Sequence, residues 1–409
     1  MREAEDIVIS RLGAKGDGVA MRDDMPLYVP FALPGERWRV SAAGDAERLS
    51  DSAERAAPVC RHFTACGGCA AQHMSPGLYN EWKRGLVVEA FRHRGIAADV
   101  APLTVVDTGS RRRAVFGIER HGGDLRIGFR EEGQHTLVDL AECPVLDPLI
   151  VRALPGLRTL VRRAMGGEVS GRLMVTRLDR GLDVSLACAR KSNLEPQDRS
   201  EIAEQARRLG LVRLVVGGEL IVATGRPTVT IAGVEIEIAP ELFLQAVPQA
   251  ETLLADLTLA ALPKRAKAVA DLFSGVGTLT LPMARRASVT AFDSDRRAIE
   301  ALQGAVRHTQ GLKPVTAIVR DLFRDPLSVR ELGLFDAVVL DPPRAGAAMQ
   351  TERLAKSKVP LVVAVSCNPA TLARDARVLI DGGYRMGAVT PIDQFLYSPH
   401  VEAVAVFRK

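Results

Sequence analysis

Residues 361–383 read LVVAVSCNPATLARDARVLIDGG, and this stretch predicts how the C-terminal part of the chain folds. It begins with a short apolar run, which is typical of a strand that is covered on both faces. A helical pattern follows at once, with Asn368 placed to cap the helix and Pro369 in its first turn. Glycines at 382 and 383 can end that helix. The stretch therefore predicts a strand that passes directly into a helix.

The same order of strand and helix recurs along residues 241–409. Apolar runs that predict strands are KAVADLF (267–273), SVTAFD (288–293) and FDAVVLD (335–341). Strands that alternate with helices are typical of an α/β domain built on a doubly wound parallel sheet. We therefore expect a Rossmann-like C-terminal domain.

The first 240 residues follow a different pattern. Residues 1–55 contain short strand-like runs separated by GDG and PG turns, which favour a small β-barrel, and a polar linker follows at 44–57. Residues 56–240 contain mostly strand patterns with turns. The expected division is therefore 1–55, 56–240 and 241–409.

Composition is that of an ordinary globular protein. The 409 residues carry a net charge of +5, which permits a nucleic-acid partner without requiring one. The N-terminus lacks the apolar core of a signal peptide, and no apolar run is long enough to span a bilayer. We expect a cytoplasmic protein with reduced cysteines, no membrane contact and no obligate protein partner.

The carboxyl ends of the predicted strands indicate a ligand site, because ligands of open α/β sheets bind there. Gly275 and Gly277 allow a tight turn after one strand, and Asp293 ends the next, where an acid can bind ribose hydroxyls. A Gly-x-Gly alone is more often a plain turn. The third glycine of the dinucleotide fingerprint is absent, so we favour an adenosyl ligand without phosphates, such as S-adenosylmethionine.

The DPPRAG stretch (341–346) follows another strand. Asp-Pro-Pro could simply end a strand, since Pro cannot continue the hydrogen-bond ladder. Asp341 is also placed to meet a cofactor and a substrate. Arg344 stands where adenine N6-methyltransferases carry an aromatic residue, which argues against adenine as the substrate.

Cys367 lies where a strand passes into a helix. Most buried cysteines only pack, but helix amides at this position favour a thiolate. Methylation of uracil at C5 needs such a thiolate, because C5 becomes nucleophilic only after a thiolate has added to C6. We therefore interpret Cys367 as a nucleophile.

The same chemistry requires a base to remove the C5 proton. Glu402 shares one strand face with Val404 and Val406, so it does not lie on an ordinary solvated face. It could be this base, or an acid at a strand end that pairs with an arginine, and the sequence does not decide between them.

Cys60, Cys66 and Cys69 form a C-x5-C-x2-C pattern, and Cys143 precedes a proline. A zinc site, with His62 and His73 as spare ligands, is one interpretation, but zinc ligands usually come as paired C-x2–4-C units. A loose triplet with a distant fourth cysteine is more typical of an iron–sulfur cluster.

Taken together, the chain resembles the RNA 5-methyluridine methyltransferases, in particular the branch that acts on 23S ribosomal RNA. SCNPATLARD (366–375) is close to a signature of that family. The resemblance implies an S-adenosylmethionine-dependent methyltransferase domain, an OB-like N-terminal TRAM barrel and a 4Fe–4S cluster held by the four cysteines. It also implies Cys367 as nucleophile and Glu402 as base. Cofactor-binding positions that it implies are Gln245, Phe273, Gly275, Gly277, Thr278, Asp293, Asp321 and Asp341.

Three residues depart from the family pattern. Val247 and Thr278 stand where Asn is usual, near the implied cofactor site, and Ser110 replaces a Tyr ahead of three arginines.

The substrate that this interpretation favours is a uridine of 23S ribosomal RNA. Basic residues expected to contact RNA phosphates are Lys15, Arg37 and Arg39 in the barrel and Arg111, Arg112 and Arg113 in the central region. Alternatives are a transfer-RNA uridine, a non-catalytic RNA-binding or folding factor, and a cytosine-5 methyltransferase. The last usually needs a second motif cysteine, and none stands near DPPR.

Overall fold

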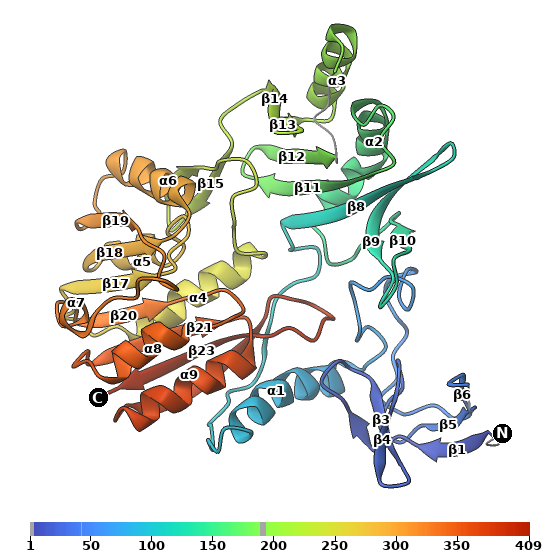
Figure 1. The fold of residues 1–409 in the computed structure, drawn as a ribbon, viewed down its shortest axis with the longest axis horizontal. Coiled ribbons are helices and arrows are strands. Elements are labelled where there is room, and N and C mark those ends of the chain that lie inside the picture. The colour runs from blue at the N-terminus through green and yellow to red at the C-terminus, as the bar shows by residue number, and fades with distance from the viewer. Residues whose placement is uncertain (1–3, 42, 189–193) are drawn as a thin grey trace.

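The computed structural model describes residues 4–41, 43–188 and 194–409. Figure 1 shows three regions: small N-terminal sheets, a central sheet with two helices, and a large C-terminal sheet with helices on both faces. No helix in the described ranges is both long and apolar enough to cross a membrane.

The N-terminal region consists of two three-stranded sheets that share one core. One sheet has the order β1-β5-β6 and the other β2-β3-β4. Their bounds are β1 Glu5–Val8, β2 Arg11–Leu12, β3 Gly18–Arg22, β4 Met25–Val29, β5 Arg37–Val40 and β6 Ala46–Arg48. Side chains from both sheets, among them Ile7, Ala20 and Trp38, form a common buried cluster. The expected small β domain is confirmed, as two sheets.

The central region is a seven-stranded sheet of order β10-β9-β8-β11-β12-β13-β14. Its strands are β8 Arg113–His121, β9 Asp124–Arg130, β10 Leu137–Asp139, β11 Ser170–Leu178, β12 Gly181–Cys188, β13 Leu211–Val216 and β14 Glu219–Ala223. Neighbours are antiparallel except β12 and β13, which are joined through helix α3 (Pro196–Arg208). Helices α2 (Pro148–Ala164) and α3 pack together on the sheet.

The C-terminal sheet has eight strands in the order β19-β18-β17-β20-β21-β23-β22-β7. Their bounds are β7 Thr104–Val105, β17 Ala268–Leu272, β18 Ser288–Asp293, β19 Val315–Val319, β20 Ala337–Leu340, β21 Leu361–Ser366, β22 Arg385–Asp393 and β23 Glu402–Arg408. The five strands from β19 to β21 are parallel, as expected, but β23 runs antiparallel to both neighbours. The connection between β22 and β23 is too short for the crossover that a parallel pair needs, so the sheet is mixed rather than wholly parallel.

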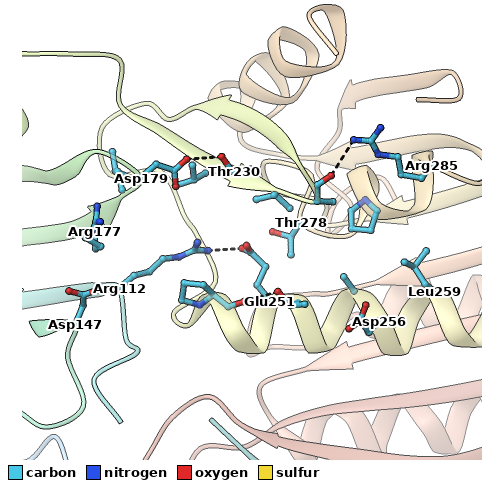
Figure 2. Close-up of a pocket in the computed structure, with 18 of the residues that line it drawn as sticks. Arg112, Asp147, Arg177, Asp179, Thr230, Glu251, Asp256, Leu259, Thr278 and Arg285 are labelled. Atoms are coloured by element: carbon cyan, nitrogen blue, oxygen red, sulfur yellow. Dashed lines mark hydrogen bonds and ion pairs between the residues drawn. The ribbon is translucent and has the colours of Figure 1, made fainter. Parts of the chain in front are cut away.

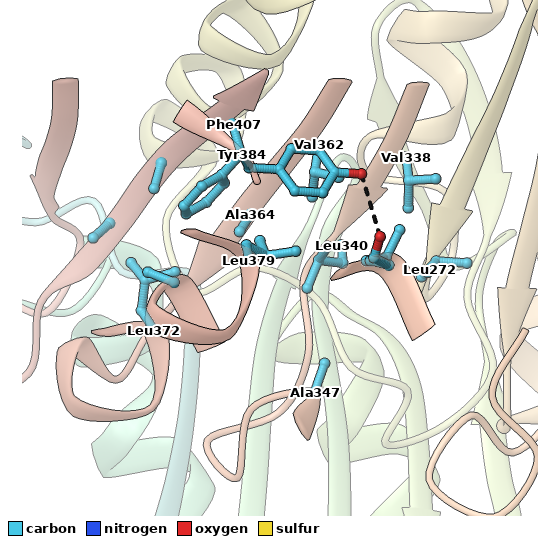
Figure 3. Packing of buried hydrophobic residues seen from close by; sticks show 14 of the residues in the cluster. Leu272, Val338, Leu340, Ala347, Val362, Ala364, Leu372, Leu379, Tyr384 and Phe407 are labelled. Carbon is cyan, nitrogen blue, oxygen red and sulfur yellow. Dashed lines mark hydrogen bonds between the residues drawn. The ribbon is translucent and has the colours of Figure 1, made fainter. Parts of the chain in front are cut away.

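Helices cover both faces of this sheet (Figure 1). The helices of this region are α1 Pro76–Arg92, α4 Pro248–Ala261, α5 Thr280–Ala284, α6 Arg296–Arg307, α7 Val329–Leu332, α8 Ala348–Ala355 and α9 Pro369–Asp381, with a hairpin of β15 Thr228–Ile231 and β16 Val234–Glu237 beside α6. Along β21, Val362 and Ala364 face the cluster with α1, α8 and α9, whereas Val363 and Val365 face the cluster with α4 and α5. Figure 3 shows the first cluster, in which Tyr384 donates to the Val359 carbonyl at 2.8 Å.

The expected strand-to-helix passage at 361–383 is confirmed. The Asn368 side chain accepts the Ala370 N–H, Pro369 is the first helical residue, and Gly382 is the C-cap. Asn368 also donates to the Arg344 carbonyl at 3.0 Å, which holds the start of α9 beside the DPPRAG loop.

Residues 76–105 join the C-terminal sheet although they lie in the expected central segment. Helix α1 packs on α9 and β22, and β7 adds the edge strand beside β22. Val87 and Phe91 of α1 are fully buried in the same cluster as Val362. The packing of residues 76–105 thus crosses the expected boundary, and the division into domains at 56 and 240 stays a prediction.

The central and C-terminal regions also meet through a buried ion pair. Arg112 lies 2.6 Å from Glu251 of α4 and donates to the Gln245 carbonyl. Figure 2 shows this pair beside a cavity of about 700 Å³ between the two regions. Arg112 was expected to face RNA, and that expectation is wrong: the residue is buried, because successive side chains of an extended chain point to opposite sides.

A second buried ion pair joins α1 to the loop after β22. The Lys83 amine lies 2.7 Å from Asp393 Oδ1, and both side chains are fully buried. The amine also donates to the carbonyls of Phe395, Ser398 and His400. Burial lowers the pKa of Lys83, and the Asp393 charge opposes that shift. One amine thus holds the loop that leads to Glu402.

We expect Lys83→Met to destabilise the protein by about 3–5 kcal/mol, because it leaves Asp393 buried without its counter-charge. The measurement is equilibrium unfolding in guanidinium chloride. Lys264→Met, at an exposed position, serves as control and should change stability by less than about 0.5 kcal/mol. Equal stability of the two variants would contradict the role given to the pair.

Candidate active site

A cavity of about 1040 Å³ lies at the carboxyl ends of β17, β18, β20 and β21. Its wall brings together most residues that the sequence singled out: Cys69, Cys143, Gln245, Phe273, Gly275, Thr278, Asp293, Asp341, Cys367 and Glu402. Lys15, Arg111 and Arg113 add positive charge from the N-terminal and central regions. Gly277, Asp321, Cys60 and Cys66 lie outside this wall.

The two arginines of the N-terminal region that were expected to contact RNA phosphates are less available for that contact. Arg37 and Arg39 both contact Asp6, at 3.4 and 2.9 Å, so their charge is partly offset within the barrel.

One end of the cavity is built around the turn after β17. The Asp293 carboxylate accepts the Gly275 N–H and the Asp295 N–H, each at 2.8 Å. Gly277 has a φ of +97°, and a Cβ there would lie 2.6 Å from Leu302, so only glycine suits this turn. These contacts hold the strand-end acid against the glycine turn, and ribose binding by Asp293 stays a prediction.

Aromatic side chains flank that end. Phe273 and Phe323 have ring centroids 5.4 Å apart, and both line the cavity. Asp321 accepts the N–H of Phe323 at 3.0 Å and therefore shapes the loop that carries this ring. Phe273 itself has a φ of +63°, a left-handed conformation that is costly for a residue with a Cβ.

The opposite end contains a relay of hydrogen bonds between two acids. Gln245 Nε2 donates to Asp341 Oδ2 at 2.8 Å, and Gln394 Nε2 donates to Gln245 Oε1 at 3.2 Å. Gln394 Nε2 also donates to Glu402 Oε2, while Glu402 Oε1 has no partner among the residues that the structure describes. One oxygen of Glu402 is thus held and the other is free to take a proton.

Burial and mutual repulsion shape the titration of these acids. Burial raises the pKa of Asp341 to about 7. The pKa of Glu402 lies well above its usual value, first because of burial and then because of the Asp341 charge. A raised pKa matches a carboxylate that must hold a proton during turnover. The alternative, that Glu402 pairs with an arginine, finds no support: the side chain that binds it is Gln394.

Cys367 lies half-buried at the end of β21, in the same cavity as Glu402. Burial raises the pKa of its thiol to about 11, and the charges of Glu402 and Asp341 add to the effect, while Arg344 opposes it. Burial and two nearby acids thus oppose the helix amides that were expected to favour a thiolate.

The cysteine loops lie against the same cavity. Burial raises the pKa of Cys69 to about 12, and the nearby Cys143, Cys66 and Cys60 contribute to that shift. The sulfur of Cys143 accepts the N–H groups of Val145 and Leu146. In the described part of the chain, no three His, Cys, Asp or Glu residues are grouped so as to hold a metal ion. His62 accepts the Ala141 N–H, and both ring nitrogens of His73 are buried without a partner.

The departures from the family pattern have structural consequences. Val247 is buried at the N-cap of α4, which begins without a side-chain cap. Thr278 lines both this cavity and the one in Figure 2. Ser110 donates to the Asp107 carbonyl, so its hydroxyl stabilises its own turn.

Sequence reasoning missed Gln394, Asp271 and Ser274, all of which are buried and line the cavity. A signal was present for each, since Ser274 and Gln394 are polar residues just beyond an apolar strand run and Asp271 is an acid inside one. Burial raises the pKa of Asp271 to about 7, and its Oδ2 accepts from Thr280.

Comparison with known proteins shows which proteins this chain is similar to. Residues 238–409 match the family model of tRNA (uracil-5-)-methyltransferases. An uncharacterized RNA methyltransferase of Rhizobium meliloti is 44% identical over 98% of this chain and 99% of its own. A 23S rRNA (uracil(1939)-C(5))-methyltransferase, RlmD, of Alkalilimnicola ehrlichii is 35% identical over 100% of this chain and 97% of its own.

A solved structure shares the fold along nearly the whole chain. The tRNA (uracil-54, C5)-methyltransferase of Pyrococcus abyssi, in complex with S-adenosyl-L-homocysteine, aligns with a TM-score of 0.75 and 24% identity. The alignment covers 98% of this chain and 99% of that one, so it includes the N-terminal sheets.

We expect alkylation of Cys367 by iodoacetamide to accelerate about tenfold per pH unit between about pH 7 and pH 10, because the reactive thiolate fraction rises tenfold per unit below the pKa. Peptide mass spectrometry measures the rate at this cysteine alone. Free N-acetylcysteine, with an ordinary pKa near about 8.5, should level off earlier and serves as reference. A rate at Cys367 that levels off before that of the reference would show a lowered pKa instead.

Proposed function

Because the chain belongs to the RNA uracil-C5 methyltransferase family, it is an S-adenosylmethionine-dependent enzyme, and we propose that it methylates a uridine of 23S ribosomal RNA through a covalent adduct with Cys367. The observation that carries the proposal is that the Cys367 thiol and the free oxygen of Glu402 share one cavity with the glycine turn and Asp293.

The residues of the site suit each step of this reaction. The Cys367 thiol gives up its proton to solvent and its sulfur adds to C6 of uracil, while the electrons of the C5–C6 double bond move toward O4, which makes C5 nucleophilic. Bound S-adenosylmethionine would supply the methyl group that C5 takes, with its sulfur–methyl bond breaking to leave S-adenosyl-L-homocysteine. Glu402 Oε1 then removes the C5 proton, the C5–C6 double bond re-forms, and the bond from sulfur to C6 breaks. Cys367 is thereby regenerated for the next turnover.

The donor would lie at the β17 end of the cavity. The residues proposed to hold it directly are Gln245, Phe273, Gly275, Thr278, Asp293 and Asp341, with Gly277 and Asp321 shaping the two loops around them. The fit rests on three features: an anchored acid for ribose hydroxyls, aromatic rings for the adenine, and two unpartnered buried atoms, Asp271 Oδ1 and Ser274 Oγ.

The substrate assignment rests on the relative from Alkalilimnicola ehrlichii, whose name specifies 23S rRNA and which matches the whole chain. The N-terminal sheets, proposed as a TRAM domain, support RNA binding but do not separate the two RNA classes. The Pyrococcus abyssi enzyme, a tRNA methyltransferase, aligns with the same region. A uridine of tRNA therefore remains the second candidate, and either substrate implies a cytoplasmic enzyme.

We also propose that Cys60, Cys66, Cys69 and Cys143 hold a 4Fe–4S cluster. Burial raises the pKa of the Cys69 and Cys143 thiols, and neighbouring cysteines add to the shift, so their thiolates would be stabilised by a bound metal, which keeps thiolates deprotonated. Each thiolate of such a cluster binds a different iron, so the sulfurs need not converge on one point as zinc ligands do. A Cβ at Gly67 would lie 2.9 Å from the Arg130 carbonyl, so the loop fits tightly there. A cluster would fix the loop that forms one cavity wall.

The catalytic roles predict different outcomes for two variants. Cys367→Ala should lose methyl transfer by at least about a thousandfold and keep its affinity for S-adenosylmethionine, since the thiol acts on the uracil ring and not on the methyl donor. Glu402→Gln should accumulate a covalent protein–RNA adduct, visible on denaturing gels, because the C5 proton stays in place. Substantial turnover by Cys367→Ala would refute the covalent mechanism, and normal turnover by Glu402→Gln would identify another base.

Anaerobically purified protein should contain about four irons and four sulfides per chain. Metal analysis and visible absorption provide the measurement, and Cys143→Ser should lower the iron content while Cys188→Ser should not. Stoichiometric zinc without visible absorption would support the zinc interpretation instead.

Labelled methyl groups should enter protein-free 23S ribosomal RNA as 5-methyluridine and should be absent from bulk transfer RNA. Nucleoside analysis followed by mass mapping of fragments identifies the base and its position. Label in transfer RNA alone would establish the second candidate, and no label in either RNA would exclude the proposal.

A further inference from the structure

Within the described part of the chain, five buried polar atoms of residues that line the catalytic cavity have no hydrogen-bond partner: Arg113 Nε, Asp271 Oδ1, Ser274 Oγ, Gln394 Oε1 and Glu402 Oε1. Two of them lie beside the glycine turn after β17, where the donor is proposed to bind. Glu402 Oε1 is the proposed base. Gln394 Oε1 has no role yet, although an unsatisfied buried acceptor is unfavourable and calls for a ligand.

The orientation of the Gln394 amide follows from its neighbours. Its Nε2 donates to both Gln245 Oε1 and Glu402 Oε2. Gln245 must in turn point its own Nε2 toward Asp341 Oδ2, 2.8 Å away. A flipped Gln394 would place its carbonyl oxygen against two acceptors. The relay therefore makes Gln394 Oε1 a fixed acceptor, because both amide hydrogens are already used.

The pyrimidine bases differ in what they offer such an acceptor. Uracil carries a donor at N3, whereas N3 of cytosine is an acceptor and would face the Gln394 oxygen unfavourably. N3 lies only two bonds from C5 in the ring. A carboxylate that removes the C5 proton and an acceptor for the N3–H must therefore be neighbours. Glu402 and Gln394, which are hydrogen-bonded to each other, meet this condition.

We propose that Gln394 Oε1 accepts the N3–H of the target uracil and thereby selects uridine over cytidine. The proposal rests on the proposed function, since it takes uracil as the base that enters the cavity. The same amide holds one oxygen of Glu402, so the selection of uracil and the placement of the Glu402 carboxylate depend on one side chain. A buried acceptor built to receive a hydrogen bond discriminates strongly, because the wrong base leaves it unpaired.

The test compares two transcripts of the RNA fragment that the wild-type enzyme methylates, one with uridine and one with cytidine at the target position. Their affinities are measured with Cys367→Ala protein, so that no adduct forms. Adding Gln394→Leu should lower the preference for the uridine transcript by about tenfold, as expected for one hydrogen bond to a buried acceptor. Adding Gln303→Leu, the same substitution at an exposed glutamine of α6 outside the cavity, should leave the preference unchanged.

A third transcript keeps the test independent of how the Gln394 variant folds. N3-methyluridine at the target lacks the N3–H, so Cys367→Ala protein with Gln394 intact should bind it about tenfold more weakly than uridine. Equal binding of these two transcripts, or an unchanged preference in Gln394→Leu, would overturn the proposal while uridine methylation stands. If the wild-type enzyme methylates no uridine, the proposed function itself fails, and the inference fails with it.

Discussion

The buried ion pair between Lys83 and Asp393 is the interaction on which the catalytic region depends. Two charges removed from water are tolerated only when each finds its counter-charge and further hydrogen bonds, and here the amine also binds three carbonyls of the following loop. Tyr79 donates to the same carboxylate, and its oxygen accepts the Tyr397 N–H. The Tyr397 carbonyl in turn receives the N–H groups of residues 70 and 71, next to Cys69. The pair therefore connects helix α1, the loop before Glu402 and the cysteine loop.

The cavity gathers acids beside the proposed nucleophile. Asp271, Asp341 and Glu402 are buried in or beside it, and burial raises the pKa of each. Burial and the charges of Glu402 and Asp341 also raise the pKa of the Cys367 thiol to about 11, while Arg344 opposes the shift. This environment differs from that of a cysteine at an exposed helix N-terminus, where the thiolate is favoured.

A shared fold does not determine which RNA is methylated. The Pyrococcus abyssi tRNA enzyme and the Alkalilimnicola ehrlichii 23S rRNA enzyme both match this chain along nearly its whole length. The cavity that holds Cys367 and Glu402 is also lined by Lys15 of the N-terminal region and by Arg111 and Arg113, so basic groups from outside the C-terminal sheet lie beside it. Structured RNA is recognised mainly by shape and by its unpaired bases, so small changes in the surface around it can redirect the same catalytic cavity.

Local features of this protein were determined by its sequence alone. The cap and end of α9, the position of Cys367, the glycine turn with Asp293 and the β-rich N-terminal region each depend on residues close together in the chain. The tertiary structure alone decided what distant segments do. It placed Lys83 against Asp393, buried Arg112 with Glu251, reversed β23 and linked Gln245 to Gln394. It also set burial and two acids against the helix amides at Cys367. The physical reason is that capping and turn formation act within a few residues, whereas burial and charge pairing depend on segments that meet only after folding.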